Sequence, residues 1–117
     1  MTVPEFYESI HGDYEGVMSR LMKPERVLKY VGKFFNGAGL TELDKALAEQ
    51  RWPDAFREAH SMKGMALNLG FSILAASSSE LCEALRSGEP VGDIPAMRDA
   101  VAKDYAETEA AARVLLG

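Results

Sequence analysis

The chain has 117 residues, of which 47% are hydrophobic and 26% are charged, and its formal net charge is −5. This length fits a single compact domain over residues 1–117, and this composition is typical of a globular protein rather than a disordered one. No run of Lys or Arg forms a stripe, and the net charge is negative. Both facts argue against binding to nucleic acid or to an anionic membrane surface.

The one cysteine, Cys82, excludes an internal disulfide and a cysteine-rich zinc site. A lone thiol is typical of a protein from a reducing compartment. The residues after Met1 lack the basic and apolar regions of a signal peptide, and the most apolar stretch, residues 65–76, is too short to cross a bilayer. We therefore expect a cytoplasmic protein that does not enter a membrane, and the starting Met1 favours a free-standing one.

Glycine and proline residues divide the chain into pieces of helix length, and no stretch alternates with the period of a β-strand. Thr2 and Glu5 form a capping-box pattern around Pro4, which predicts a short first helix ending near residues 11–12. Apolar residues at steps of three and four predict helices over residues 14–22, 24–35, 40–51, 53–69, 71–87 and 94–116, with loops at 36–39 and 87–93. The fold class is therefore all-α, as an antiparallel four-helix bundle with additional short N-terminal helices.

The helix expected over residues 53–69 carries the most informative pattern. At about 100° per residue, its apolar residues form one buried stripe, to which Trp52 and Phe56 belong. The opposite arc holds Arg57, Ser61, Gly64 and Asn68. His60 falls at the edge of the stripe, where packing can hold its ring on one side and solvent can reach it on the other.

Lys63 follows His60 by three residues, so its ammonium can approach the imidazole, which has no carboxylate partner on this helix face. Such a pair suits an arriving anion, because the ammonium can stabilise the charge on the oxygens of a phosphoryl group in transfer. Gly64 costs a helix interior about 1 kcal/mol relative to alanine. Something else therefore requires this glycine, either clearance for a docking partner or close helix–helix packing.

The spaced residues Ala59-His60-x-x-Lys63-Gly64-x-x-x-Asn68-Leu69-Gly70 resemble the signature of histidine phosphotransfer (HPt) domains. The later pattern Ser79-Glu80-Leu81-x-x-Ala84-Leu85-Arg86 is similar to the next core helix of that family. The resemblance implies a helical bundle in which His60 accepts a phosphoryl group, Lys63 matches the family's lysine and Gly64 its small residue. It also implies relay between receiver-domain aspartates, without ATP or any cofactor, so that any magnesium belongs to the partner receiver domain.

Two features depart from the family pattern. The loop at residues 36–39 interrupts what is often a longer helix, and Cys82 stands where some members carry a polar side chain that orients the histidine. What orients the His60 ring is therefore open at this point. The exposed residues around the histidine are candidates for partner docking, namely Arg57, Ser61, Gly64, Leu67, Asn68 and Arg86.

The leading hypothesis is a monomeric phosphocarrier, rather than a true enzyme, whose partners are response-regulator receiver domains and a hybrid histidine kinase. The alternative is a non-catalytic helical adaptor that binds a protein partner through the same helix face, with His60 incidental. Phosphate on His60 distinguishes the two. No metal site is expected, because neither histidine has a spacing typical of metal ligands.

Overall fold

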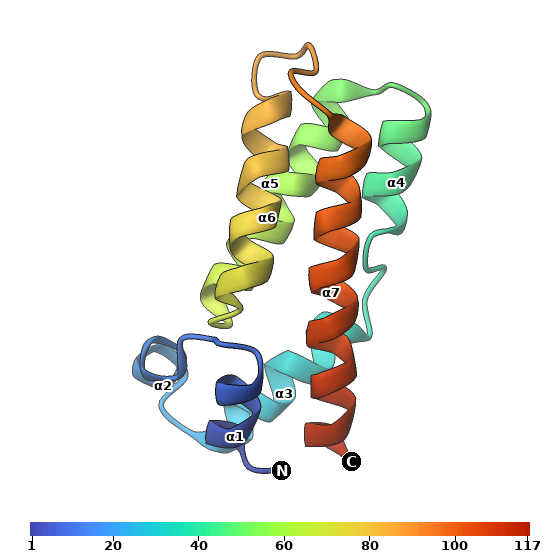
Figure 1. The fold of residues 1–117 in the computed structure, drawn as a ribbon. Coiled ribbons are helices and arrows are strands. Elements are labelled where there is room, and N and C mark those ends of the chain that lie inside the picture. Colours follow the sequence, from blue (N-terminus) through green and yellow to red (C-terminus); the bar gives the residue numbers. More distant parts are fainter.

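The computed structural model describes residues 1–117 and contains seven α-helices and no β-strand (Figure 1). The helices are α1 (Val3–Ser9), α2 (Tyr14–Leu21), α3 (Pro24–Phe35), α4 (Thr41–Ala48), α5 (Trp52–Asn68), α6 (Ser72–Leu85) and α7 (Ile94–Leu116). In the bundle, α5 packs against α4 and α6, and α6 packs against α7. The predicted all-α fold is confirmed, with α4–α7 as the bundle and α1–α3 as the added N-terminal helices.

Helix α7 joins the two parts of the molecule. It is 23 residues long, and one half packs in the bundle while the other half contacts α1 and α3 (Figure 1). Between α7 and α4, Arg98 forms a bidentate ion pair with Asp44, with both nitrogen–oxygen distances 2.7 Å. The four bundle helices are therefore linked around their whole circumference, and the molecule measures 42 × 24 × 19 Å.

The predicted helix starts agree well with the structure, and the ends differ by up to three residues. The capping box is present, since Thr2 and Glu5 each accept a hydrogen bond from the other's backbone amide. Helix α4 ends at Ala48 rather than at residue 51, because Gln50 adopts the left-handed conformation (φ +56°) and the Arg51 amide closes the turn. Sequence periodicity does not reveal such closing bonds.

The C-terminal end of α5 is hydrogen-bonded by the α1–α2 region. The acceptors are the backbone carbonyls of Leu67, Asn68, Leu69 and Gly70. Arg20 donates to the first two at 2.9 and 3.1 Å, the Tyr7 hydroxyl to the third at 2.6 Å, and the Asp13 amide to the fourth at 2.8 Å. The last carbonyls of a helix find no N–H donor within that helix, so these hydrogen bonds from α1 and α2 cap the end of α5.

Phe71, directly after this turn, anchors it in an aromatic cluster. Its ring is buried and lies 5.5 to 6.3 Å, between centroids, from the rings of Phe6, Tyr7, Phe34 and Phe35. Aromatic pairs of this kind contribute about 0.5–1.5 kcal/mol beyond their burial. The turn that ends α5 is therefore held by polar contacts with α1 and α2 and by apolar contacts with α1 and α3.

The α5–α6 turn and the α1–α2 turn approach each other backbone to backbone. Gly70 has a φ of +73°, as expected for the residue after a helix C-terminus, and a Cβ atom there would lie 2.7 Å from the Asp13 carbonyl oxygen. On the other side, a Cβ atom on Gly12 would lie 2.6 Å from the Gly70 carbonyl oxygen. Gly70 is thus required for its backbone conformation and for space.

We expect Gly70→Ala to lower the free energy of unfolding more than Gly88→Ala. Gly88 also has a positive φ, of +88°, but its position is open, so alanine there costs only the conformational strain of about 1–2 kcal/mol. At Gly70 the contact with Asp13 adds about 1–3 kcal/mol. Urea denaturation followed by circular dichroism measures both losses, and equal losses would contradict the close contact of the turns.

Candidate functional site

His60 lies in the middle of α5 with its side chain exposed. Its neighbours on the inner face of the helix, Ala59 and Met62, are buried. The position predicted for this ring, at the boundary between core and solvent, is confirmed. A nucleophile at such a boundary is accessible to a partner while the packed side of its ring is held.

Two side chains contact the His60 ring. The Phe56 ring, one turn earlier on α5, stacks on it with a centroid distance of 5.9 Å and an interplanar angle of 23°. The Cys82 Sγ, on α6, lies 3.9 Å from Nδ1. The sulfur therefore faces the Nδ1 side of the ring. Burial raises the pKa of the Cys82 thiol, so the sulfur faces Nδ1 as an uncharged group at neutral pH.

Arg86 extends this arrangement to a third layer. Its guanidinium carbon lies 5.2 Å from the centre of the Phe56 ring, within cation–π distance. Glu83 holds the same guanidinium through two hydrogen bonds of 2.6 and 2.9 Å. The layers Arg86, Phe56 and His60 therefore join α6 to α5 on the outer face of the helix pair.

Phe56 and Trp52 were predicted to lie in the buried stripe, which is wrong, because both are only partly buried. Trp52 is the first residue of α5, so no preceding turn covers it. Phe56 is at the edge of the stripe, where it supports His60. The spacing of four residues, which places two side chains on the same helix face, is a sequence signal for this contact.

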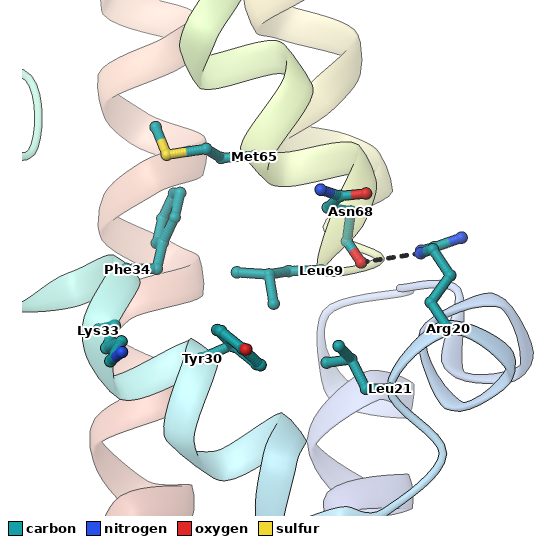
Figure 2. Close-up of a pocket in the computed structure, with 8 residues that line it drawn as sticks. All are labelled: Arg20, Leu21, Tyr30, Lys33, Phe34, Met65, Asn68 and Leu69. Carbon is teal, nitrogen blue, oxygen red and sulfur yellow. Dashed lines mark hydrogen bonds between the residues drawn. The ribbon is translucent and has the colours of Figure 1, made fainter.

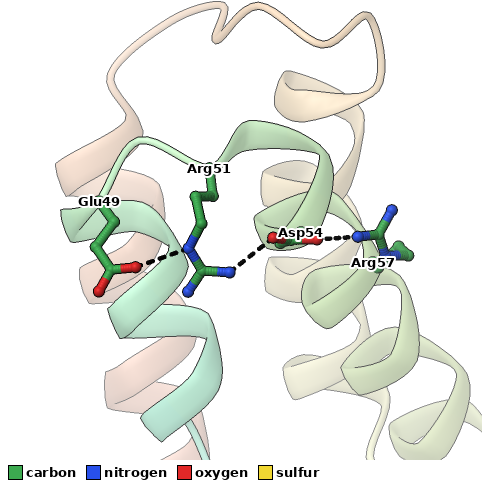
Figure 3. A network of polar contacts seen from close by, with 4 residues as sticks. All are labelled: Glu49, Arg51, Asp54 and Arg57. Atoms are coloured by element: carbon green, nitrogen blue, oxygen red, sulfur yellow. Dashed lines mark hydrogen bonds and ion pairs between the residues drawn. The ribbon is translucent and has the colours of Figure 1, made fainter.

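Arg57, a candidate docking residue, is engaged at the N-terminal end of α5 (Figure 3). It pairs with Asp54, which also accepts a hydrogen bond of 2.7 Å from Arg51, and Arg51 pairs in turn with Glu49 at 2.7 Å. Asp54 lies in the first turn of α5, where a carboxylate interacts favourably with the helix dipole. The charge of Arg57 is thus neutralised one turn before His60 rather than directed at the imidazole.

Lys63 differs from the two arginines near His60. Arg57 and Arg86 each have a carboxylate partner, whereas Lys63 forms no ion pair in the structure. The pKa of Glu83 is lowered chiefly by its hydrogen bond from Arg86 and, to a smaller degree, by the charge of Lys63. Lys63 is therefore close to the α5–α6 face that holds His60, with its own charge available to an incoming anion.

A comparison with family models matches residues 36–111 to the Hpt domain, which is well over half of the chain. The chain belongs to the Hpt domain family. Membership implies phosphotransfer in two-component signalling, and Hpt domains interact in general with receiver domains and histidine kinases. Searches among curated proteins and among solved structures found no match.

The family match covers the bundle helices of this Hpt domain and begins in the loop at residues 36–39. Helices α1–α3 precede the matched residues, and the hydrogen-bond donors that cap α5 come from α1, α2 and the turn between them. No three His, Cys, Asp or Glu side chains gather closely enough to hold a metal ion. None of the helices combines the length and the apolar character that crossing a membrane demands.

Gly64 of this Hpt domain faces open space, because a Cβ atom there would have no atom within 4 Å apart from the helix itself. Helix–helix packing, one of the two explanations open from sequence, therefore does not require this glycine. The neighbouring docking candidates are also exposed, namely Ser61, Leu67 and Asn68. Together with Gly64, which has no side chain, they form an exposed surface beside His60.

We expect Gly64→Ala to raise the free energy of unfolding by about 0.5–1 kcal/mol. Alanine has the higher helix propensity, and the added methyl group meets no neighbour. Chemical denaturation of the two proteins measures the difference. A loss of stability would instead indicate that the glycine is needed for the fold.

Proposed function

We propose that this Hpt domain relays a phosphoryl group between receiver-domain aspartates through His60. The observation that carries this proposal is an exposed imidazole whose Nδ1 side faces the Cys82 sulfur and whose ring stacks on Phe56. A structural histidine would instead direct its nitrogens to hydrogen-bond partners within the protein. This geometry and the family both support the proposal that His60 is the phosphorylated residue.

Nε2 of neutral His60 is the nucleophile in the proposed reaction. It attacks the phosphorus of an aspartyl phosphate, so that the P–N bond forms while the P–O bond to the aspartate breaks. The carboxylate leaves with the bonding electrons, and the ring proton remains on Nδ1, where it faces the Cys82 sulfur. The reverse reaction with a second receiver domain returns His60 to its starting state.

Lys63 stabilises the negative charge on the phosphoryl oxygens during transfer. Its role is supported by its position three residues from His60 and by the absence of a competing carboxylate. We expect no cofactor in this chain, and any magnesium is held by the partner receiver domain. The protein is then a phosphocarrier rather than a true enzyme, since His60 is modified in each cycle.

The surface formed by Ser61, Gly64, Leu67 and Asn68 is the proposed docking surface for the receiver domain. Leu67, whose side chain is 53% exposed, supplies an apolar contact, and Gly64 provides clearance above His60. Arg57 and Arg86 lie at the rim, where their paired charges contribute hydrogen bonds rather than free charge. We expect a monomeric, cytoplasmic protein. It receives the phosphoryl group from a hybrid histidine kinase and donates it to a response regulator.

Replacing His60 by glutamine is expected to abolish phosphorylation of the chain. Purified protein is incubated with a panel of phosphorylated receiver domains from the same cell, and label on the wild-type chain is expected to be acid-labile and alkali-stable. Circular dichroism of His60→Gln controls for folding. Equal labelling of the variant and the wild type would remove the relay hypothesis and leave the adaptor alternative.

Lys63→Gln is expected to slow phosphoryl transfer to His60 by about tenfold. This loss is smaller than for a buried donor, because Lys63 is partly exposed and water screens its charge. Lys63→Arg keeps the charge and is expected to retain most of the rate. Lys103→Gln, an exposed lysine on α7, is the matched control, and an equal effect of both glutamine variants would contradict the role of Lys63.

A further inference from the structure

The basic residues of this acidic chain are concentrated in its N-terminal helices. Residues 20–33 hold five of the 13 basic residues and one of the 18 acidic residues, so this segment carries +4 and the remainder −9. Arg26, Lys29, Tyr30 and Lys33 are spaced at i, i+3, i+4 and i+7 and therefore share one face of α3. We call these four residues the α3 basic face.

A groove of about 480 Å³ lies beside the α3 basic face, between α2, α3 and the C-terminal half of α5 (Figure 2). Most of its lining is apolar and comes from Leu21, Tyr30, Phe34, Met65 and Leu69. Lys33 lies at one side of the groove and Arg20, which is hydrogen-bonded to the end of α5, lies at the other. The groove thus combines an apolar interior with a cation on each side.

The two lysines of the α3 basic face lie near the Tyr30 ring, and no carboxylate neutralises their charges. The Nζ atoms of Lys29 and Lys33 lie 6.0 and 5.8 Å from the centre of the Tyr30 ring, and neither forms an ion pair. Tyr30 itself is 43% exposed, and Met65, on the opposite side of the groove, is 45% exposed. Unpaired cations next to exposed apolar side chains form a surface that is complementary to carboxylates flanking an apolar residue.

We propose that this groove binds an acidic segment of a partner protein. An apolar side chain of the segment occupies the groove, and its carboxylates pair with Lys29 and Lys33. The site uses α2 and α3, which lie outside the residues that match the Hpt family, and it does not require phosphorylation of His60. It is therefore an interaction surface in addition to the proposed relay site.

The charge distribution favours a protein segment over nucleic acid or a membrane. An extended polyanion or an anionic bilayer would meet the remainder of the chain, which carries −9, whereas a short acidic segment meets only the α3 basic face. The groove is also concave, which suits a single side chain better than a flat lipid surface.

Binding in the groove would also hold a partner close to His60. Met65 follows His60 by five residues on the same helix, which is about 7.5 Å along the axis and about 140° around it. A protein tethered at this distance has a raised effective concentration at the histidine. The groove would then add affinity for the partners that also dock at α5.

The test uses the full chain and a display library of random twelve-residue peptides. We expect selection to enrich peptides with Asp or Glu around an apolar residue, and fluorescence anisotropy to give at least tenfold weaker binding to the double variant Lys29→Glu/Lys33→Glu. Met65→Glu is expected to weaken binding similarly by placing a charge in the groove. The double variant Lys45→Glu/Lys103→Glu changes the net charge equally on α4 and α7 and is expected to bind as the wild type does.

Selection without acidic enrichment, or equal binding by the two double variants, would overturn the proposal. So would preferential binding of duplex DNA or of phosphatidylserine vesicles that is lost in Lys29→Glu/Lys33→Glu, because the face would then serve nucleic acid or membrane. His60→Gln is expected to bind the selected peptides with wild-type affinity. An experiment that disproves phosphoryl transfer through His60 would therefore leave the groove proposal standing, and the reverse also holds.

Discussion

The packing of the N-terminal helices against the bundle depends on the hydrogen bonds that cap the C-terminal end of helix α5. Four consecutive backbone carbonyls there accept from Arg20, Tyr7 and Asp13, all of which precede the part of the chain that matches the Hpt family. The bond from Tyr7 to the Leu69 carbonyl is buried, and a buried carbonyl without a partner is costly, so α1 is part of the fold rather than an appendage. Helix α2 adds the exposed bonds of Arg20. The helix that carries His60 is thereby fixed at the end nearest the groove.

The local features of the fold were predictable from sequence, and the long-range ones were not. The periodicity of apolar residues predicts six of the seven helices, and the capping box of Thr2 and Glu5 predicts the first. The contact of Gly70 with Gly12 and Asp13 joins turns that are almost 60 residues apart, so no sequence window contains it. The end of α4 depends on the closing bond of Arg51, which periodicity also does not show.

In the candidate site, too, the local features were predictable from sequence and the long-range contacts were not. His60, Lys63 and Gly64 lie on one turn of one helix, so their spacing alone predicts that they are neighbours. The contact of Phe56 with the imidazole was not predicted, because Phe56 has the hydrophobicity of a core residue. Cys82 lies on another helix, and only the family resemblance indicated that it stands near the ring. The concentration of lysine on α3 was also missed, because its basic residues are separated in sequence and meet only at helical spacing.

The stack of Arg86, Phe56 and His60 bears on the entropy of the proposed reaction. A histidine on a bare helix surface samples several rotamers, and a partner must immobilise it at each encounter. Here the ring is confined between an aromatic plane and a sulfur atom before any partner arrives. Part of the loss of torsional freedom is therefore incurred once, when the chain folds, rather than at each encounter with a partner.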